Sequence, residues 1–290
     1  MQRAAAEPSG SCDWRVGNPT VADIGHEFVS SNPPTLRGRV RKILPLNGKE
    51  GIVTSGSVAM VTGASRGIGR ATAIRLASDF AAVVITARTQ EELQKTATAV
   101  RSAGAQPLLY VLDLCDSASA EILVQGTLEH FGRIDALLNI ASSVPGVDLF
   151  HMTDTHWDEG FALQFHGARR LTMRAWNVLK KCKGSVVMLS RTAALAPGFA
   201  AASAATDAAV IALAKAFAEK GIQDGVQVNS VASGAILMGR RRQVLEKGSI
   251  ARYGTPEEIA GLMAYLVSRG ARWLTGASIR MDGGEIKGIQ

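Results

Sequence analysis

Short apolar runs alternate with amphipathic segments from Ser57 to near the end of the chain. The apolar runs predict buried strands at 57–62, 81–87, 107–114, 135–141, 184–190, 226–233 and 277–283. The segments between them carry apolar residues at helical spacing and predict helices at 69–77, 91–104, 119–132, about 155–181, 201–220 and 256–268. Strands without polar alternation are typical of a parallel sheet with helices on both faces. Because crossovers between parallel strands are right-handed, we predict an α/β fold with a doubly wound parallel sheet of the Rossmann type.

The first 50 residues lack this alternation. They hold five of the nine prolines of the chain, at Pro8, Pro19, Pro33, Pro34 and Pro45. We predict an extended or disordered N-terminal arm over 1–50, with a short helix near 21–29 as a further possibility. The arm could cover a neighbouring subunit, or it could be a wrongly assigned start or a leader. Residues 51–290 show no internal repeat and are predicted to form a single domain.

The composition is that of a globular protein with a sizeable core. Hydrophobic residues make up 47% and charged residues 20% of the 290 residues, which excludes wholesale disorder. Cys12, Cys115 and Cys182 are widely spaced and odd in number, which excludes a disulfide scaffold and a Cys-only zinc site. Reduced thiols indicate a cytoplasmic protein. No run approaches the ~18 to 20 apolar residues of a membrane span, and the N-terminus lacks the apolar core of a secretory signal.

The charge of the chain gives little support to nucleic-acid binding. The formal net charge is +7, but the basic residues are scattered and aromatic residues are only 5% of the chain. Stacking platforms for single-stranded nucleic acid are therefore scarce. A solvated basic surface is the plain interpretation. A small anionic ligand would suit the same charge.

A glycine-rich turn stands where the first predicted strand meets the first predicted helix. Gly63, Gly67 and Gly69 lie there, with Ser65, Arg66 and Ile68 between them. Glycines at such a junction let backbone N–H groups approach a pyrophosphate, and the helix N-terminus adds partial positive charge. The turn is not a Walker loop, because no Gly-Lys-Ser/Thr follows. The alternative is a tight turn made only for packing.

The spacing Thr62-Gly63-x-x-x-Gly67-x-Gly69 resembles the short-chain dehydrogenase/reductase family, and the resemblance extends from about Ser57 to Ile289. Further motifs agree with it: Asp113-Leu114, Asn139-x-Ala141, Pro197-Gly198 and the segments 225–236, 254–260 and 275–284. The resemblance implies cofactor contacts at Asp113, Leu114, Asn139, Ala141, Gly234 and Ile236. Asp113 would bind the adenine edge, or it could cap the helix that follows.

The nucleotide is predicted from the end of the second strand. In the family an acidic residue there binds the ribose hydroxyls and favours NAD, whereas this chain reads Thr86-Ala87-Arg88. Arg66 in the glycine turn and Arg88 suit a ribose 2′-phosphate by bidentate contacts. We therefore predict NADP(H) as the cofactor. The alternative is that both arginines merely face solvent.

The family's catalytic residues are largely replaced. The resemblance places Ser203 at the position of the proton-donating Tyr, Asp207 at that of the Lys four residues later, and Gln164 at that of the Asn on the long helix. The family's Ser matches Ser190 by its separation from Ser203, or Arg191 by strand alignment. We predict Ser190, Ser203, Asp207 and Gln164 as the catalytic positions.

These replacements change the available chemistry. A serine is a far weaker acid than a tyrosine, and losing general acid–base help typically costs ~10² to 10⁴ in rate. Asp207 could accept hydrogen bonds from ribose hydroxyls, act as an acid if burial raises its pKa, or simply lie near a helix N-terminus. Arg191 could polarise a carbonyl, bind a carboxylate or form a loop salt bridge. Replacing Ser203 by Tyr and Asp207 by Lys could restore ketone reduction.

Three histidines offer weaker candidates. His166 lies near Gln164 and could instead be a surface or interface histidine. His151, Asp154 and His156 could suggest a metal, but Asp154 fits a helix cap equally well, and we predict no metal.

Two classes of function follow. The first is an NADP(H)-dependent oxidoreductase with a non-standard centre, acting on a small carbonyl or enoyl compound; Arg240 to Arg242 favour an anionic substrate unless they form an exposed basic turn. The second is a catalytically silent nucleotide-binding protein or partner subunit. Reuse of the pocket for a non-redox step is a third possibility. The resemblance and the alanine-rich helix 203–220 imply a homodimer or homotetramer.

Overall fold

The computed structural model describes residues 56–142, 148–195, 201–237, 250 and 252–287 of the chain. The predicted arm at 1–50 and the basic cluster at 240–242 lie outside these residues, so those predictions stay untested. The described residues form one compact unit. The predicted boundary at residue 51 also stays a prediction.

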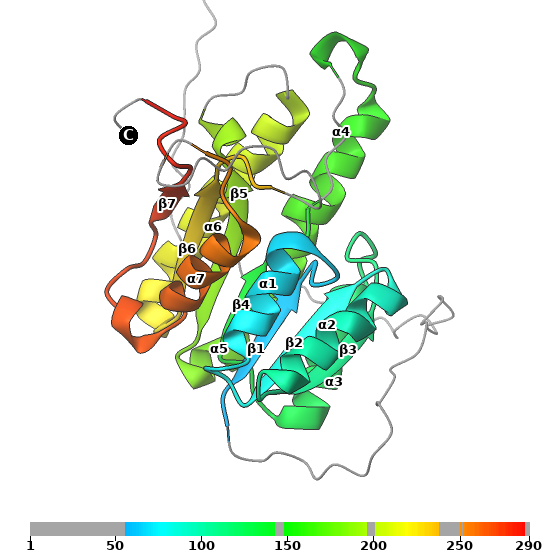
Figure 1. Ribbon diagram of the computed structural model, residues 1–290, viewed down its shortest axis with the longest axis vertical. Helices are drawn as coiled ribbons and strands as arrows, with labels where there is room; N and C mark the ends of the chain where they lie inside the picture. Colours follow the sequence, from blue (N-terminus) through cyan, green and yellow to red (C-terminus); the bar gives the residue numbers. More distant parts are fainter. Residues whose placement is uncertain (1–55, 143–147, 196–200, 238–249, 251, 288–290) are drawn as a thin grey trace, which may run out of the picture. The chain divides into compact units, whose positions relative to one another are not determined.

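A seven-stranded parallel sheet runs through the centre of this unit (Figure 1). The strand order is β3-β2-β1-β4-β5-β6-β7, and every neighbouring pair is parallel. The strands are β1 (Val58–Thr62), β2 (Ala82–Ala87), β3 (Gln106–Val111), β4 (Ala136–Asn139), β5 (Ser185–Arg191), β6 (Gln227–Ser233) and β7 (Ser278–Met281). The predicted α/β, doubly wound architecture is thereby confirmed.

Helices cover both faces of the sheet. The α-helices are α1 (Gly67–Leu76), α2 (Gln90–Ser102), α3 (Ser119–Phe131), α4 (Asp154–Phe161), α5 (Ala168–Cys182), α6 (Ala201–Asp224) and α7 (Pro256–Leu266). One core cluster joins α3, α5 and α6 to the sheet, and a second joins α1, α2 and α7 to it (Figure 1). Successive residues of β1 belong to alternate clusters: Met60 to the first and Val61 to the second. This two-sided burial explains why the strands are apolar without alternation.

The predicted helix at 155–181 is interrupted. The chain forms α4, then a π-helical segment η2 (Ala162–Gly167), and then α5. Thr153, and not Asp154, caps α4, because its hydroxyl accepts a hydrogen bond from the backbone N–H of His156. A π-helical segment inside a helix is frequent at functional sites. Short 3-10 helices follow β4, β5 and α7: η1 (Leu149–His151), η3 (Thr192–Ala194) and η4 (Arg269–Ala271).

The topology leaves a switch point beside β1. The chain proceeds from β1 to β2 and β3 on one side, and then crosses to β4 on the other side. In open parallel sheets, ligands bind in the crevice at the carboxyl ends of the strands where this reversal occurs. Within the part of the chain that the structure describes, no helix has the length and apolar character needed to cross a membrane.

Candidate functional site

A groove of about 630 Å³ lies at the carboxyl ends of the strands, where the topology places a ligand site. Its walls come from the β1–α1 turn, the ends of β2, β4, β5 and β6, and the π-helical segment η2. Most of the predicted cofactor residues line it: Gly63, Ser65, Arg66, Ile68, Gly69, Arg88, Asp113, Leu114, Ala141, Gly234 and Ile236.

The glycine turn forms the floor of the groove. Gly63 and Gly67 have φ angles of +66° and +55°, which other residues rarely adopt. A Cβ on Gly69 would lie 2.3 Å from the carbonyl oxygen of Gly63, so only glycine lets α1 pack this close to the turn. No side chain caps the N-terminus of α1. The turn is therefore a cradle whose free backbone N–H groups suit an anionic group such as a pyrophosphate.

Thr62 fixes this turn to the neighbouring strand. Its buried hydroxyl accepts hydrogen bonds from the backbone N–H groups of Ile140 at 2.9 Å and Ala141 at 3.0 Å. A Cβ on Gly63 would come within 2.9 Å of Ala141 Cα. The β1 turn and the end of β4 thus form one closely packed wall.

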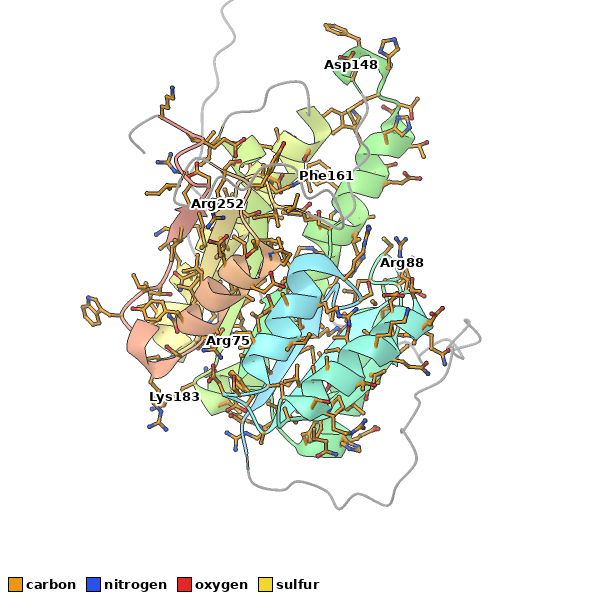
Figure 2. All side chains as sticks on the ribbon, viewed as in Figure 1. Arg75, Arg88, Asp148, Phe161, Lys183 and Arg252 are labelled. Carbon is orange, nitrogen blue, oxygen red and sulfur yellow. The ribbon has the colours of Figure 1, made fainter. Side chains whose placement is uncertain are left out.

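Two arginines stand at the end of the groove formed by β1, β2 and β3. Arg88 follows β2 directly (Figure 2). Its Nη1 lies 3.9 Å from Asp113 Oδ2. Asp113 does not cap α3; its side chain accepts the backbone N–H of Cys115 at 3.0 Å. Arg66 is exposed at the start of α1. Thr86, at the end of β2, is buried and donates to the carbonyl oxygen of Tyr110. No carboxylate stands at the β2 end itself, and both guanidiniums are accessible for a phosphate.

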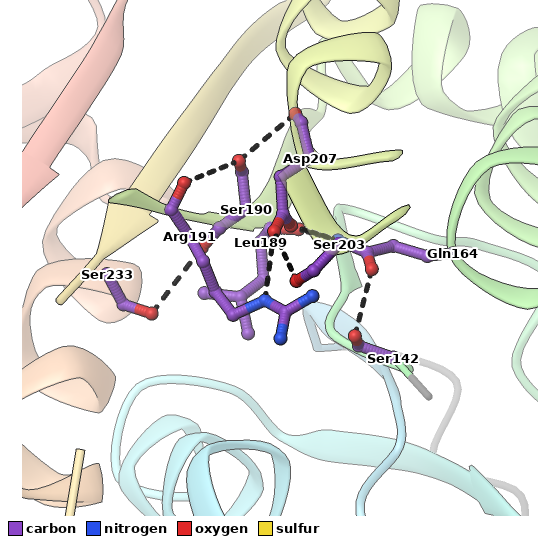
Figure 3. Close-up of polar contacts among 8 residues, drawn as sticks. All are labelled: Ser142, Gln164, Leu189, Ser190, Arg191, Ser203, Asp207 and Ser233. Carbon is purple, nitrogen blue, oxygen red and sulfur yellow. Dashed lines mark hydrogen bonds and ion pairs between the residues drawn. The ribbon is translucent and has the colours of Figure 1, made fainter. Parts of the chain in front are cut away.

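The four predicted catalytic positions converge at the other end of the groove, around Asp207 (Figure 3). The Asp207 side chain is fully buried. Its Oδ1 accepts a hydrogen bond from Gln164 Nε2 at 2.6 Å. Its Oδ2 accepts from Arg191 Nε at 2.9 Å and from the Ser203 hydroxyl at 3.4 Å. Both carboxylate oxygens are therefore engaged within the protein.

Each partner of Asp207 comes from a different element. Gln164 belongs to η2, Arg191 ends β5, and Ser203 stands one turn before Asp207 on α6. Gln164 Oε1 also accepts from the Ser142 hydroxyl at 2.9 Å, which extends the network to the loop after β4. The π-helical geometry at Gln164 thus coincides with a hydrogen bond to a buried carboxylate.

Burial and the neighbouring cation act in opposite directions on the pKa of this carboxylate. Loss of solvent raises the pKa of Asp207, and the Arg191 guanidinium, together with the hydrogen bonds from Gln164, Arg191 and Ser203, opposes that rise. Asp207 nevertheless does not line the groove, contrary to the expectation that it binds ribose hydroxyls. It holds other side chains in place instead.

Two further predicted residues also lie behind the groove wall. Asn139 is buried and donates to the Thr172 hydroxyl at 3.1 Å, so it braces α5 against β4. Ser203 is buried and points at Asp207.

Gly67 is absent from the groove lining, but its positive φ shapes the turn. Ser190 contacts the groove, yet its hydroxyl donates to the backbone carbonyl of Asp207 at 3.1 Å.

Arg191 was missing from the predicted catalytic set. It lines the groove with a side chain that is 40% exposed, and it forms an ion pair with Asp207. Strand alignment pointed to this position, but the separation from Ser203 favoured Ser190. The ion pair could not be foreseen because it joins the end of β5 to α6 across the fold.

None of the described histidines belongs to the lining of the groove. Burial, with smaller contributions from Arg169 and Arg170, lowers the pKa of His166, which does not line the groove. His151 lies 3.3 Å from Asp148 on the surface, and His156 completes the cap of α4. Among the described residues, no group of three or more His, Cys, Asp or Glu side chains gathers as a metal site would require.

Comparison with known proteins identifies the family. The sequence model of a family described as "Enoyl-(Acyl carrier protein) reductase" matches residues 63–285. The short-chain reductase protein NovJ of Streptomyces niveus is 31% identical over 248 residues, covering 80% of this chain and 95% of that protein. The chain therefore belongs to the short-chain dehydrogenase/reductase family.

Solved structures share the fold. The short-chain dehydrogenase/reductase from Serratia marcescens is 32% identical, with a TM-score of 0.73 over 80% of this chain and 98% of that one. L-Sorbose reductase from Gluconobacter frateurii, solved with NADPH and L-sorbose, is 25% identical, with a TM-score of 0.75 over 82% of this chain and 99% of that one.

Proposed function

We propose that the chain is an NADP(H)-binding oxidoreductase with a non-standard catalytic centre, acting on a small carbonyl or enoyl compound. The observation that carries this proposal is the groove, which joins a glycine cradle to two arginines at its β2 end and to Arg191 at its β5 end. The cradle fits the cofactor, because glycine at Gly63 and Gly69 lets the turn pack closely against Ala141 and α1 while no side chain caps the N–H groups at the start of that helix. The solved relative complexed with NADPH supports the same choice of nucleotide.

Different residues of the groove would bind different parts of the cofactor. Backbone N–H groups of the β1–α1 turn would hold the pyrophosphate, and Arg66 and Arg88 would hold the 2′-phosphate. When bound, NADPH supplies a hydride. No tyrosine or lysine belongs to the described lining of the groove, so no side chain there can act as the usual acid. Proton delivery falls to water, which favours substrates that need little acid help, such as conjugated enoyl compounds.

Nucleotide binding is the first test. We expect NADPH and NADP⁺ at ~100 Kd to stabilise the protein by ~2.7 kcal/mol, a melting-temperature rise of several degrees. The double variant Arg66→Gln, Arg88→Gln should lose this preference over NADH and NAD⁺. The matched control Arg101→Gln, an exposed residue at the end of α2, should keep it. Absence of a shift with every nucleotide would refute the proposal.

A catalytically silent nucleotide-binding protein is the second candidate. The observation in its favour is that both carboxylate oxygens of Asp207 are engaged within the protein and that Asp207 does not line the groove, so it offers no acid there. Oxidation of NADPH with a panel of carbonyl and enoyl compounds separates the two. Turnover with any member supports the oxidoreductase, whereas nucleotide binding without turnover across the panel supports the silent protein.

We also propose that the chain assembles as a homodimer or homotetramer through α6. Ala208, Ala212 and Ala216 are exposed small residues at helical spacing on this helix, and small side chains permit close approach of a second helix. A cytoplasmic location, inferred from the odd number and wide spacing of the three cysteines in the sequence, remains part of this proposal.

A further inference from the structure

The Arg191 guanidinium has hydrogen-bonding capacity that the chain does not use. Nε donates to Asp207 Oδ2, but neither Nη1 nor Nη2 donates a hydrogen bond to any other described residue. Nη2 is also shielded from solvent. A donor without an acceptor is costly, and the 40% exposed guanidinium lines the groove, where an acceptor from outside the chain can approach it.

Asp207 fixes the direction of this guanidinium. The hydrogen bond to Nε ties the inner part of the arginine to a carboxylate that Gln164 and Ser203 hold from other sides (Figure 3). Since the guanidinium is planar, holding Nε leaves the fork of Nη1 and Nη2 as its free edge. Such a fork matches the two oxygens of a carboxylate in a bidentate contact.

Among the described residues that line the groove, no carboxylate stands beside Arg191. Asp207 lies behind the wall, and the neighbouring lining residues Ser142, Ser190, Ser233 and Gly234 are neutral. The acids of the groove, Glu92 and Asp113, stand at the opposite end within 4.0 Å of Arg70 and Arg88. The guanidinium of Arg191, whose side chain is 40% exposed, is therefore available to a ligand that enters the groove.

We propose that Arg191 is the receptor for a carboxylate group of the substrate, which makes the substrate a small carboxylic acid. This deepens the proposed function, on which it rests for the place of the nucleotide. The probe of the receptor is nevertheless independent of turnover, because a carboxylate can be titrated into the protein without any hydride acceptor.

The test compares butyrate with butyramide, which share a shape but differ in charge. Calorimetric titration of the full chain saturated with NADP⁺ should show butyrate binding at least about ten times more tightly than butyramide. Arg191→Gln should abolish this difference, and Arg191→Lys should weaken it because the bidentate fork is lost. The surface control Arg101→Gln should bind butyrate as the wild type does. NADP⁺ affinity should be the same in all four proteins.

Removing Arg191 leaves Asp207 buried without a cation, so the single variant could fold poorly. The double variant Arg191→Gln, Asp207→Asn removes both charges and keeps neutral groups of similar size. It should also bind butyrate no better than butyramide. Butyrate preference that survives in this folded double variant, or its absence from the wild type, would overturn the proposal. If an Arg191 variant binds both probes as the wild type does but reduces a neutral carbonyl compound more slowly, Arg191 stabilises a transient oxyanion and is not a carboxylate receptor.

Titration without NADP⁺ separates this proposal from the nucleotide assignment. If NADP⁺ does not bind but butyrate still distinguishes the wild type from Arg191→Gln, the carboxylate receptor stands and the proposed cofactor fails. If butyrate preference disappears with Arg88→Gln and persists with Arg191→Gln, the probe occupies the other end of the groove and the receptor assignment fails.

Discussion

Arg191 and Asp207 place a cation at the end of β5 and an anion on α6. The family resemblance assigns a lysine to Asp207 and, by strand alignment, a serine to Arg191, although the separation from Ser203 favours Ser190. On the strand alignment, the charge at the α6 position is reversed and β5 provides the cation. Replacing Ser203 by Tyr and Asp207 by Lys would therefore set an ammonium against the Arg191 guanidinium. Because the ion pair links the two positions, we expect that ketone reduction returns only when Arg191→Ser accompanies Ser203→Tyr and Asp207→Lys, which an NADPH oxidation assay of the double and triple variants measures.

Loss of Arg191 should destabilise the protein in a pH-dependent way. Arg191→Ala leaves a buried carboxylate unpaired, and we expect a loss of about 3 kcal/mol in the free energy of unfolding. Burial raises the pKa of Asp207, and Arg191 opposes this rise. The contribution that Asp207 makes to the free energy of unfolding through its raised pKa is fully present below the ordinary carboxyl pKa. It is lost as the pH rises through the raised pKa of the folded protein. The loss should be larger at about pH 8 than at about pH 5. Denaturant unfolding at both pH values measures it, and an equal loss at both would contradict this prediction.

Gly69 should tolerate no side chain. In Gly69→Ala the new Cβ would stand 2.3 Å from the Gly63 carbonyl oxygen, so we expect a destabilisation of about 1–3 kcal/mol and loss of nucleotide binding. Gly261→Ala on α7 is the matched control, because a Cβ there meets nothing within 4 Å. It should stabilise the protein by about 0.5–1 kcal/mol, since alanine suits a helix better. Thermal unfolding with and without NADPH tests both variants.

Among the elements of the fold, the positions of the strands could be predicted from the sequence more fully than the contacts of the candidate site. Strands such as 81–87 are apolar throughout, and continuous burial on both faces of a parallel sheet produces that pattern directly. The glycine turn was predictable because steric limits act locally at Gly63 and Gly69. The π-helical segment at Gln164 was not, since 155–181 has uninterrupted helical spacing and the deviation accompanies a partner on α6. The Asp207 network escaped prediction for the same reason.

Asp224 joins the C-terminal parts of α5 and α6. Its carboxylate accepts hydrogen bonds from Trp176 Nε1, Lys180 and Lys220. The hydrogen bonds from Lys180, Lys220 and Trp176 hold the pKa of Asp224 well below its usual range. A lowered pKa gives stability that is present above the ordinary carboxyl pKa of 3.8 and is lost as the pH falls through the lowered value.

Asp224→Asn should therefore lower the melting temperature near neutral pH, and the difference from the wild type should shrink as the pH falls below about 4. Melting curves across this range provide the measurement. High salt should also reduce the difference, because both lysines are exposed and salt screens exposed charges. A difference that does not change with pH would show that the hydrogen bonds act without the charge.

At the scale of the whole molecule, α6 serves the fold and is also the proposed contact between copies. Val210, Ala214 and Ala218 face the core of their own chain, whereas Ala208, Ala212 and Ala216 are exposed. The buried set secures Asp207 against β5, and the exposed set leaves room for a second helix. An assembly through this face would therefore stand directly behind the Asp207 network.

Ala212→Arg should break such an assembly without unfolding the chain. Light scattering after size exclusion should give a smaller mass for this variant than for the wild type, because a long cation prevents close helix contact. Ala103→Arg, at an exposed position after α2, is the control and should keep the wild-type mass. Equal masses for all three proteins would exclude α6 as the contact.

The groove takes its two ends from separate parts of the chain. The nucleotide cradle is built by the turn after β1 and the ends of β2 and β3, whereas the Asp207 network belongs to η2, β5 and α6. Among the described residues, no hydrogen bond joins the nucleotide cradle to the residues of the Asp207 network. The protein is thus modular within a single domain. Libraries that vary only Gln164, Arg191, Ser203 and Asp207 could install new reactions while the cofactor end is inherited unchanged, which makes this chain a starting scaffold for enzyme design.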